Sequence, residues 1–210
     1  MPPPAITIYG DRPVGSRRRR AAVRRRRITM LVGAALVVVL VIVAMPLFKQ
    51  AYQRATLPLA YAPVIRQQAA EKHLDPALIA AVIYAETKFD ARTSPAGAEG
   101  LMQILPQTAE FLAHRSGATT FSVSDLGTPE VNIAYGSYYL RYLLDAYGGS
   151  QTLALAAYNG GEANVNRWVA HYGRDMSVDE IPFPETRAYV LKVAQAQHDY
   201  RQQYAQQLGY

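Results

Sequence analysis

Hydrophobic and polar positions follow two different patterns along the 210-residue chain. Residues 28–48 form an uncharged run dominated by Leu, Val, Ile and Ala. A helix of about 20 apolar residues crosses the hydrocarbon core of a membrane, so this run predicts one transmembrane helix. Within residues 60–210, apolar positions instead recur every three or four residues, and no alternating strand pattern of useful length appears. We therefore expect an almost wholly helical domain there.

Seven helices are expected in that domain, each from a start or stop signal. Asp or Ser at the N-cap position, Pro in the first turn and Gly after the last turn are typical of helix ends. The expected helices cover residues 61–72, 76–86, 106–116, 129–147, 151–157, 162–172 and 184–208. The fourth has a broad apolar face and is predicted to pack against the second. Its tyrosines and the single tryptophan are interpreted as core residues: Tyr135, Tyr138, Tyr139, Tyr142 and Trp168.

The residues before the apolar run are basic and polar. Residues 1–27 hold nine Arg and one Asp, a net charge of +8, and include two blocks of four Arg. The segment lacks a hydrophobic period and is expected to be a disordered tail. Basic residues beside a membrane helix stay in the cytoplasm, which predicts a cytoplasmic amino end. An Arg-rich arm could instead bind nucleic acid, but the adjoining apolar run favours the topological role.

The apolar run is interpreted as an uncleaved anchor. A signal peptide has a shorter apolar region and a small-x-small cleavage site close behind it. Here the run is longer, and residues 46–49 offer no such site. We expect a single-pass anchor over residues 28–48, a connector over residues 49–59 and the folded domain over residues 60–210.

Charge and composition exclude several classes of function for the folded domain. The chain has a formal net charge of +6, so the residues after the basic tail carry about −2. A nearly neutral domain does not indicate a nucleic-acid partner. Cysteine is absent and the four histidines are scattered. We expect neither a disulfide, nor a metal, nor any other cofactor.

Glu86 is the candidate catalytic residue in this pattern. The helix that begins after Asp75 carries Ile79, Val82 and Ile83 on one apolar face, and Glu86 continues that face. A carboxyl group held partly away from water has a raised pKa and stays protonated near neutral pH, as a general acid must. The alternative is that Glu86 lies at a frayed helix end and faces water.

The residues that follow favour a cleft. Residues 94–100, SPAGAEG, form a turn of small residues with two glycines, which lets the backbone approach a ligand closely. Gln103 then places one amide within an apolar run. An acid, a tight turn and an amide within two dozen residues indicate a cleft rather than a plain core.

Several ordered motifs resemble the family 1 (Slt-type) lytic transglycosylase domain of bacteria, which has a lysozyme-like fold. They are Glu86-Thr87 with Phe89 behind it, SPAGAEGLMQ at residues 94–103 and AYNG at residues 157–160. The similarity covers about residues 61–195. One departure is Ala91 after Asp90, where the family usually has proline. The spacing from Glu86 to Ser94 is also one residue shorter than is common.

The resemblance implies cleavage of peptidoglycan glycan strands on the cell-wall side of the cytoplasmic membrane. Glu86 would be acid and then base, and the product would be a 1,6-anhydro-N-acetylmuramic acid end. The resemblance places five further residues in the substrate groove: Ser94, Gln103, Tyr158, Asn159 and Glu185. From the residues alone, Asn159 with its glycines is also a plain helix stop, and Glu185 also suits a helix N-terminus.

Two other functions remain open at this point. A hydrolytic muramidase of similar fold would use water in place of the sugar's own hydroxyl. A non-catalytic peptidoglycan-binding envelope protein would need no partly buried acid, so Glu86, Gln103 and Tyr158 together argue against it.

Overall fold

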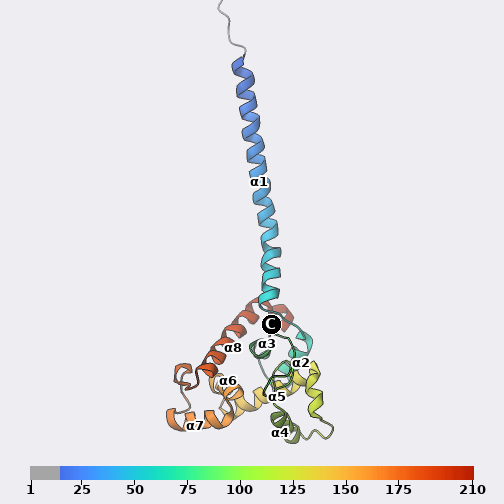
Figure 1. Cartoon of the computed structure of the whole chain (residues 1–210), viewed down its shortest axis with the longest axis vertical. Coiled ribbons are helices and arrows are strands. Elements are labelled where there is room, and N and C mark those ends of the chain that lie inside the picture. The colour runs from blue at the N-terminus through green and yellow to red at the C-terminus, as the bar shows by residue number, and fades with distance from the viewer. Residues whose placement is uncertain (1–14) are drawn as a thin grey trace, which may run out of the picture. The chain divides into compact units, whose positions relative to one another are not determined.

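The computed structural model describes residues 15–210, and the first half of the expected tail, residues 1–14, lies outside the described residues. The chain divides into two compact units, Met1–Gln53 and Arg54–Tyr210 (Figure 1). We describe each unit by itself.

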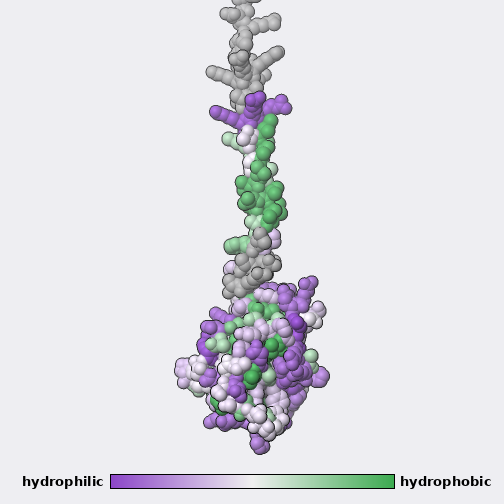
Figure 2. Space-filling model, turned by 90° about the vertical axis from the view of Figure 1, so that its right-hand side faces the viewer, coloured by the Kyte–Doolittle hydropathy of each residue, from purple (hydrophilic) through white to green (hydrophobic). Residues whose placement is uncertain are grey.

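Helix α1 (Gly15–Thr56) contains the whole apolar run. The stretch Arg24–Pro46 is long and apolar enough to span a membrane, and none of it is buried. Figure 2 shows its band of hydrophobic side chains next to hydrophilic ones. The structure differs from our expectation at both ends: residues 15–27 are helical rather than disordered, and most of the connector is helical too. Arg, Ala, Gln and Lys dominate these flanks and favour helix, so the apolar helix continues through them.

The second unit is made of helices. They are α2 (Ala62–Lys72), α3 (Pro76–Glu86), α4 (Pro106–Ser116), α5 (Pro129–Ala146), α6 (Gln151–Gly160), α7 (Glu162–Tyr172), α8 (Pro184–Gln203) and α9 (Ala205–Leu208). Two short 3₁₀ turns, η1 (Val123–Gly127) and η2 (Val178–Glu180), lie between them. Within residues 15–210 the only β-pairing is an isolated bridge between Glu99 and Ile104. The predicted mainly α fold is confirmed.

Most of the predicted helix ends are confirmed. The Asp75 side chain accepts a 2.9 Å hydrogen bond from the Ala77 amide and caps α3. Ser150 caps α6 in the same way, and Gly117 ends α4 with a left-handed φ of 75°. Two ends are wrong. The helix predicted over residues 151–157 continues to Gly160 in α6, so Tyr158 and Asn159 are helical. The last helix, predicted to run to residue 208, is divided, because α8 stops before Tyr204 and the short α9 follows.

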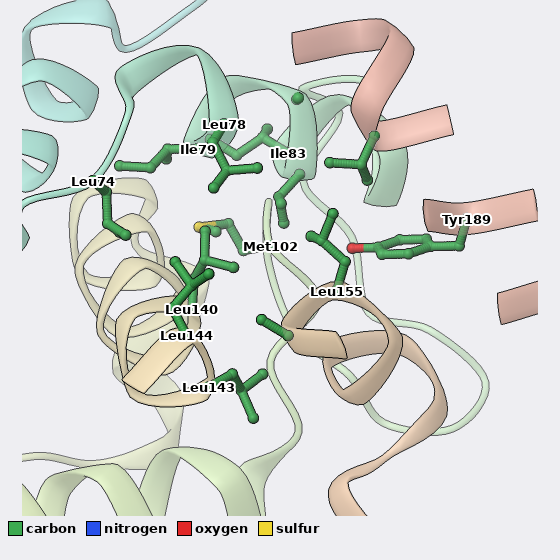
Figure 3. Close-up of a cluster of buried hydrophobic side chains, with 14 of the residues drawn as sticks. Leu74, Leu78, Ile79, Ile83, Met102, Leu140, Leu143, Leu144, Leu155 and Tyr189 are labelled. Atoms are coloured by element: carbon green, nitrogen blue, oxygen red, sulfur yellow. The ribbon is translucent and has the colours of Figure 1, made fainter. Parts of the chain in front are cut away.

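Helix α3 lies at the centre of the unit. Every residue from 77 to 83 is buried, so the helix is covered on all sides. Figure 3 shows Leu78 and Ile83 pointing into the same cluster as Met102 and Leu140. The most extensive partner of α3 is α8, followed by α2.

The prediction that α3 packs chiefly against α5 is therefore wrong. Helix α5 packs mainly against α6 and α2. A helix that is apolar all round has several neighbours, and its periodicity does not say which neighbour is nearest.

Most of the aromatic residues predicted to be core residues do belong to the core. Trp168 is only 8% exposed and meets Phe183 edge to face, with ring centroids 4.9 Å apart. Tyr135, Tyr139 and Tyr142 are partly buried against the core. Tyr138 departs from this expectation, because it is not among the residues that pack against the core cluster.

Candidate active site

Glu86 is the last residue of α3, where the chain turns sharply. The next residue, Thr87, is buried, and its hydroxyl donates to the backbone carbonyls of Ile83 (3.2 Å) and Leu101 (2.8 Å). Lys88 and Phe89 then adopt left-handed φ angles of 54° and 66°. Left-handed φ angles are uncommon for residues other than glycine, so two consecutive ones mark a strained turn. The turn fixes the end of the helix and with it the position of Glu86.

The Glu86 carboxyl lies in a largely dry environment with one hydrogen-bond donor. The Tyr189 hydroxyl, from α8, donates to Glu86 Oε1 at 2.8 Å. Burial raises the pKa of Glu86 from 4.5 to about 7, although the Tyr189 hydrogen bond and the charges of Lys192 and Arg92 act to lower it. A pKa this close to neutral pH suits a group that must both give and take a proton.

The loop after α3 is tied together by its own side chains. Ser94 Oγ accepts from the Ala98 amide at 2.9 Å, and the backbones of these two residues also bond at 2.8 Å. Gln103 Nε2 donates to the carbonyls of Arg92 (2.7 Å) and Gly100 (2.9 Å). Ser94 and Gln103, both predicted substrate-site residues, thus shape the loop beside the acid.

Asn132 of α5 holds this loop against the helical core. Its side chain is fully buried; Oδ1 accepts from the Met102 amide at 2.8 Å, and Nδ2 donates to the carbonyls of Glu99 and Leu126. Gly100 must be glycine here, because its φ is 73° and a Cβ would lie 2.2 Å from Asn132 Nδ2. Asn132 had no assigned role from the sequence, and its role is to position the loop.

The two predicted residues of the AYNG motif occupy neighbouring places. The Tyr158 hydroxyl donates to the Met102 carbonyl at 2.9 Å. Burial and the nearby charge of Glu86 raise the pKa of Tyr158 well above its ordinary value. Tyr158, Asn159 and Gln103 line one pocket of about 190 Å³. Asn159 also accepts a 2.9 Å hydrogen bond from Thr186.

The predicted residues thus fall into a central and a peripheral group. Glu86 and Tyr158 interact electrostatically, and Gln103 and Asn159 share the Tyr158 pocket. Glu185 is exposed and lines a second pocket of about 400 Å³, which Asn159 also lines. Neither Ser94 nor Glu185 forms a hydrogen bond to Glu86 within residues 15–210, so their predicted substrate contacts stay predictions.

Three residues at the site were missed in the sequence. Tyr189 contacts Glu86 directly, and Arg92 and Lys192 act on it through their charges. A signal for Tyr189 existed: it lies one helical turn after Glu185, on the face of α8 that also carries buried Val190 and Val193. No such signal marks Arg92 or Lys192. Among the described side chains, no three His, Cys, Asp or Glu residues gather in a way that could hold a metal ion.

Comparison with known proteins defines the class. Residues 63–177, more than half of the chain, match the model of the transglycosylase SLT domain, and the chain belongs to this family. The soluble lytic murein transglycosylase of Escherichia coli K12 is 33% identical over 142 residues, which cover 65% of this chain and 22% of that protein. A membrane-bound lytic murein transglycosylase C of Yersinia pestis is 33% identical over 169 residues, covering 67% of this chain and 46% of the relative.

Solved structures show the same lysozyme-like domain. An inactive Glu-to-Gln mutant of the lytic transglycosylase Slt from Pseudomonas aeruginosa superposes with a TM-score of 0.67 and 30% identity, over 73% of this chain and 26% of that one. The soluble lytic transglycosylase Slt70 of E. coli and a complex of the 70-kDa soluble lytic transglycosylase with bulgecin A each give a TM-score of 0.66. This chain therefore spans about a quarter of these proteins.

Proposed function

We propose that this protein is a membrane-anchored lytic transglycosylase. It cleaves the β-1,4 bond between N-acetylmuramic acid and N-acetylglucosamine in peptidoglycan and leaves a 1,6-anhydro-N-acetylmuramic acid end. The observation that carries the proposal is a single carboxyl group, Glu86, with a pKa near 7 at the end of a buried helix. Apart from burial, the groups that act on this pKa are Tyr189, Lys192 and Arg92, and none of them is a carboxylate.

A single carboxyl must serve both halves of the reaction. Glycosidases with two carboxylates divide the roles of acid and of nucleophile or base between them. Here Glu86 gives its proton to the glycosidic oxygen, which leaves with N-acetylglucosamine, while the substrate's acetamido oxygen stabilises the anomeric carbon. The ionised Glu86 then removes the proton of the muramyl 6-hydroxyl, whose oxygen bonds to the anomeric carbon. The proton returns to Glu86, and no water is consumed.

The contacts around Glu86 suit this sequence of steps. The Tyr189 hydroxyl occupies Oε1, and within residues 15–210 the other oxygen, Oε2, accepts no hydrogen bond and is free to exchange a proton. The pocket beside Tyr158 supplies an amide from Gln103 and another from Asn159, the kinds of polar group that orient a sugar. Correct orientation favours the intramolecular hydroxyl over water.

The comparisons support the same reaction class. The relatives from E. coli and Y. pestis carry the name lytic murein transglycosylase. The P. aeruginosa neighbour is inactive as a Glu-to-Gln mutant, as expected for a family with one essential glutamate.

Product mass tests the proposed reaction. Purified sacculi are digested with the protein, and the muropeptides are measured by mass spectrometry without prior borohydride reduction. We expect ends of 1,6-anhydro-N-acetylmuramic acid, one water lighter than hydrolysis products. A digest dominated by reducing muramic acid ends would identify a hydrolytic muramidase. If no soluble material is released, the alternative of a non-catalytic peptidoglycan-binding protein is favoured.

The membrane placement is a second part of the proposal. Helix α1 carries the apolar stretch Arg24–Pro46, with basic residues at its amino end. This arrangement supports a single-pass anchor with the amino end in the cytoplasm and the catalytic unit on the cell-wall side. Protease added to spheroplasts is expected to digest the catalytic unit and to spare the Arg-rich tail. Complete protection of the catalytic unit would contradict this topology.

A further inference from the structure

Three cations surround the end of helix α3 beside the catalytic acid. An Arg92 guanidinium nitrogen donates to the backbone carbonyl of Glu86 itself at 3.1 Å. Lys192, one helical turn after Tyr189 on α8, donates to the Ala85 carbonyl at 2.6 Å. Lys88 follows Glu86 by two residues, in the strained turn. All three side chains are exposed and therefore available to a ligand.

None of the three cations forms an ion pair in the part of the chain that the structure describes. Its ion pairs join Lys72 to Glu71, Arg141 to Asp145 and Arg201 to Asp75, all outside this cluster. Burial lowers the pKa of Lys192, the charges of Lys88 and Arg92 lower it further, and the charge of Glu86 raises it. Lys192 is therefore repelled by two neighbouring cations and attracted by one carboxylate.

Helix capping uses only some of the hydrogen-bond donors of the three cations. Cations near a helix C-terminus interact favourably with its free carbonyl groups, as Lys192 and Arg92 do here. An ammonium group has three N–H donors and a guanidinium five, and each uses one in these contacts. The Lys88 ammonium donates to no group within residues 15–210. The cluster thus keeps unused donors and positive charge on the exposed side of the acid.

We propose that Lys88, Arg92 and Lys192 bind the carboxylates of the peptide stem on the muramic acid unit whose bond Glu86 breaks. This inference rests on the proposed function. The stem is attached to the lactyl group of that same sugar and carries several carboxylates. Because two of the cations hold the backbone of residues 85 and 86, a muramyl unit at Glu86 presents its stem beside them. The cluster would make the enzyme favour strands with acidic stems.

Two substrates that differ only in the charge of their stems test the inference. Soluble glycan strands with intact stems are compared with strands whose stem carboxylates have been converted to amides. For the wild type we expect a higher kcat/KM on the acidic stems, mainly through a lower KM, and a smaller preference in high salt. In Lys88→Gln/Lys192→Gln the ratio of the two kcat/KM values should fall about tenfold, the loss expected for two partly exposed ion pairs.

Two further variants control the experiment. Arg167→Gln/Arg174→Gln removes the same charge from exposed positions elsewhere and should keep the wild-type ratio. Lys192→Arg retains the charge and should keep most of the preference. Equal losses of the Lys88/Lys192 variant on both substrates would show that the cluster acts only on Glu86 or on the fold, and would overturn the inference.

The outcome also separates this inference from the proposed function. A wild type that cleaves both kinds of strand equally well overturns the stem site and leaves the transglycosylase proposal standing. A wild type that releases no soluble fragment from either kind of strand overturns the proposed function itself.

Discussion

The two ends of helix α3 each hold a partly buried carboxyl group, and the pKa values of the two groups are shifted in opposite directions. At the amino end, Asp75 accepts hydrogen bonds from the Ala77 amide and from the side chains of Gln197, Arg201 and Tyr210. Burial alone would raise the pKa of Asp75, but these donors outweigh it and hold the pKa below its ordinary value. At the carboxyl end, Glu86 has one side-chain donor, and burial dominates.

The number of donors explains the difference. A carboxylate that accepts several hydrogen bonds is stabilised in its charged form, and a desolvated one is stabilised in its neutral form. Position on the helix acts in the same direction, because the amino end favours negative charge and the carboxyl end disfavours it. Asp75 is therefore suited to hold the fold together, and Glu86 to exchange a proton. The comparison predicts that substitutions at the two ends separate activity from stability.

The largest expected effect is the loss of activity in Glu86→Gln. The amide keeps the shape and can still accept from Tyr189, but it cannot exchange a proton. Activity on sacculi should fall by about 10²–10⁴-fold, the usual contribution of general acid–base catalysis. Circular dichroism should show an unchanged fold. Glu110→Gln, on the exposed face of α4, is the matched control and should keep its activity. Activity within a few-fold of wild type in Glu86→Gln would point to another acid, with Glu185 the first suspect.

The next effect in size is the loss of stability in Asp75→Ala. This change removes the cap of α3 and leaves the donors from the C-terminal segment without their acceptor. We expect the free energy of unfolding to fall by about 2–4 kcal/mol, from a lost N-cap and lost charge-assisted hydrogen bonds. Urea denaturation measures it. Asp175→Ala, an exposed aspartate, should change stability by less than about 0.5 kcal/mol. Equal stabilities for the two variants would contradict the structural role of Asp75.

The sequence predicted both ends of α3, for local reasons. Asp75 followed by Pro76 is a helix start that needs no tertiary information, and the period of Ile79, Val82 and Ile83 carries on to Glu86. The motifs around Gln103 and Tyr158 were found because they are contiguous in the chain. These features depend on residues within about two turns of one another.

What the sequence did not show depends on distant residues. Tyr189 reaches Glu86 across 103 positions, and Gln197 reaches Asp75 across 122. Periodicity shows that one face of a helix is buried but not which helix covers it. The prediction that α5, rather than α8, is the main packing partner of α3 is wrong for this reason. The cations Arg92 and Lys192 were missed for the same reason, since a charged residue in an exposed turn or helix looks like any solvated one.

The two carboxyl groups should also give stability opposite pH dependences. The pKa of Glu86 is higher in the folded state, about 7, than its ordinary value of 4.5, so the folded state binds more protons between these values. The stability from neutral Glu86 is fully present below pH 4.5 and is lost as the pH rises through 7. Asp75 behaves in the reverse sense, because its pKa is lowered: its contribution is present above pH 3.8 and is lost as the pH falls.

Thermal unfolding across this pH range measures the effect of Glu86. Glu86→Gln should gain stability relative to wild type as the pH rises from 4.5 to 8, by about 1–3 kcal/mol. Glu110→Gln again serves as the control and should follow the wild type at every pH. A constant difference between Glu86→Gln and wild type would mean that the carboxyl is not desolvated in the folded protein.

The smallest expected effect, and the most specific, is that of Tyr189→Phe. The phenol hydrogen bond favours the charged form of Glu86, so its removal should raise the pKa of Glu86 above 7. The enzyme needs protonated Glu86 at the first step, and kcat/KM therefore declines on the alkaline side of this pKa. In Tyr189→Phe that decline should move to higher pH by about one unit, with a few-fold loss of kcat as the carboxyl becomes less well oriented. Tyr172→Phe, an exposed tyrosine on α7, should leave the pH profile unchanged. If kcat falls but the pH profile does not move, Tyr189 only packs against Glu86. Its hydrogen bond would then have no effect on the pKa of Glu86.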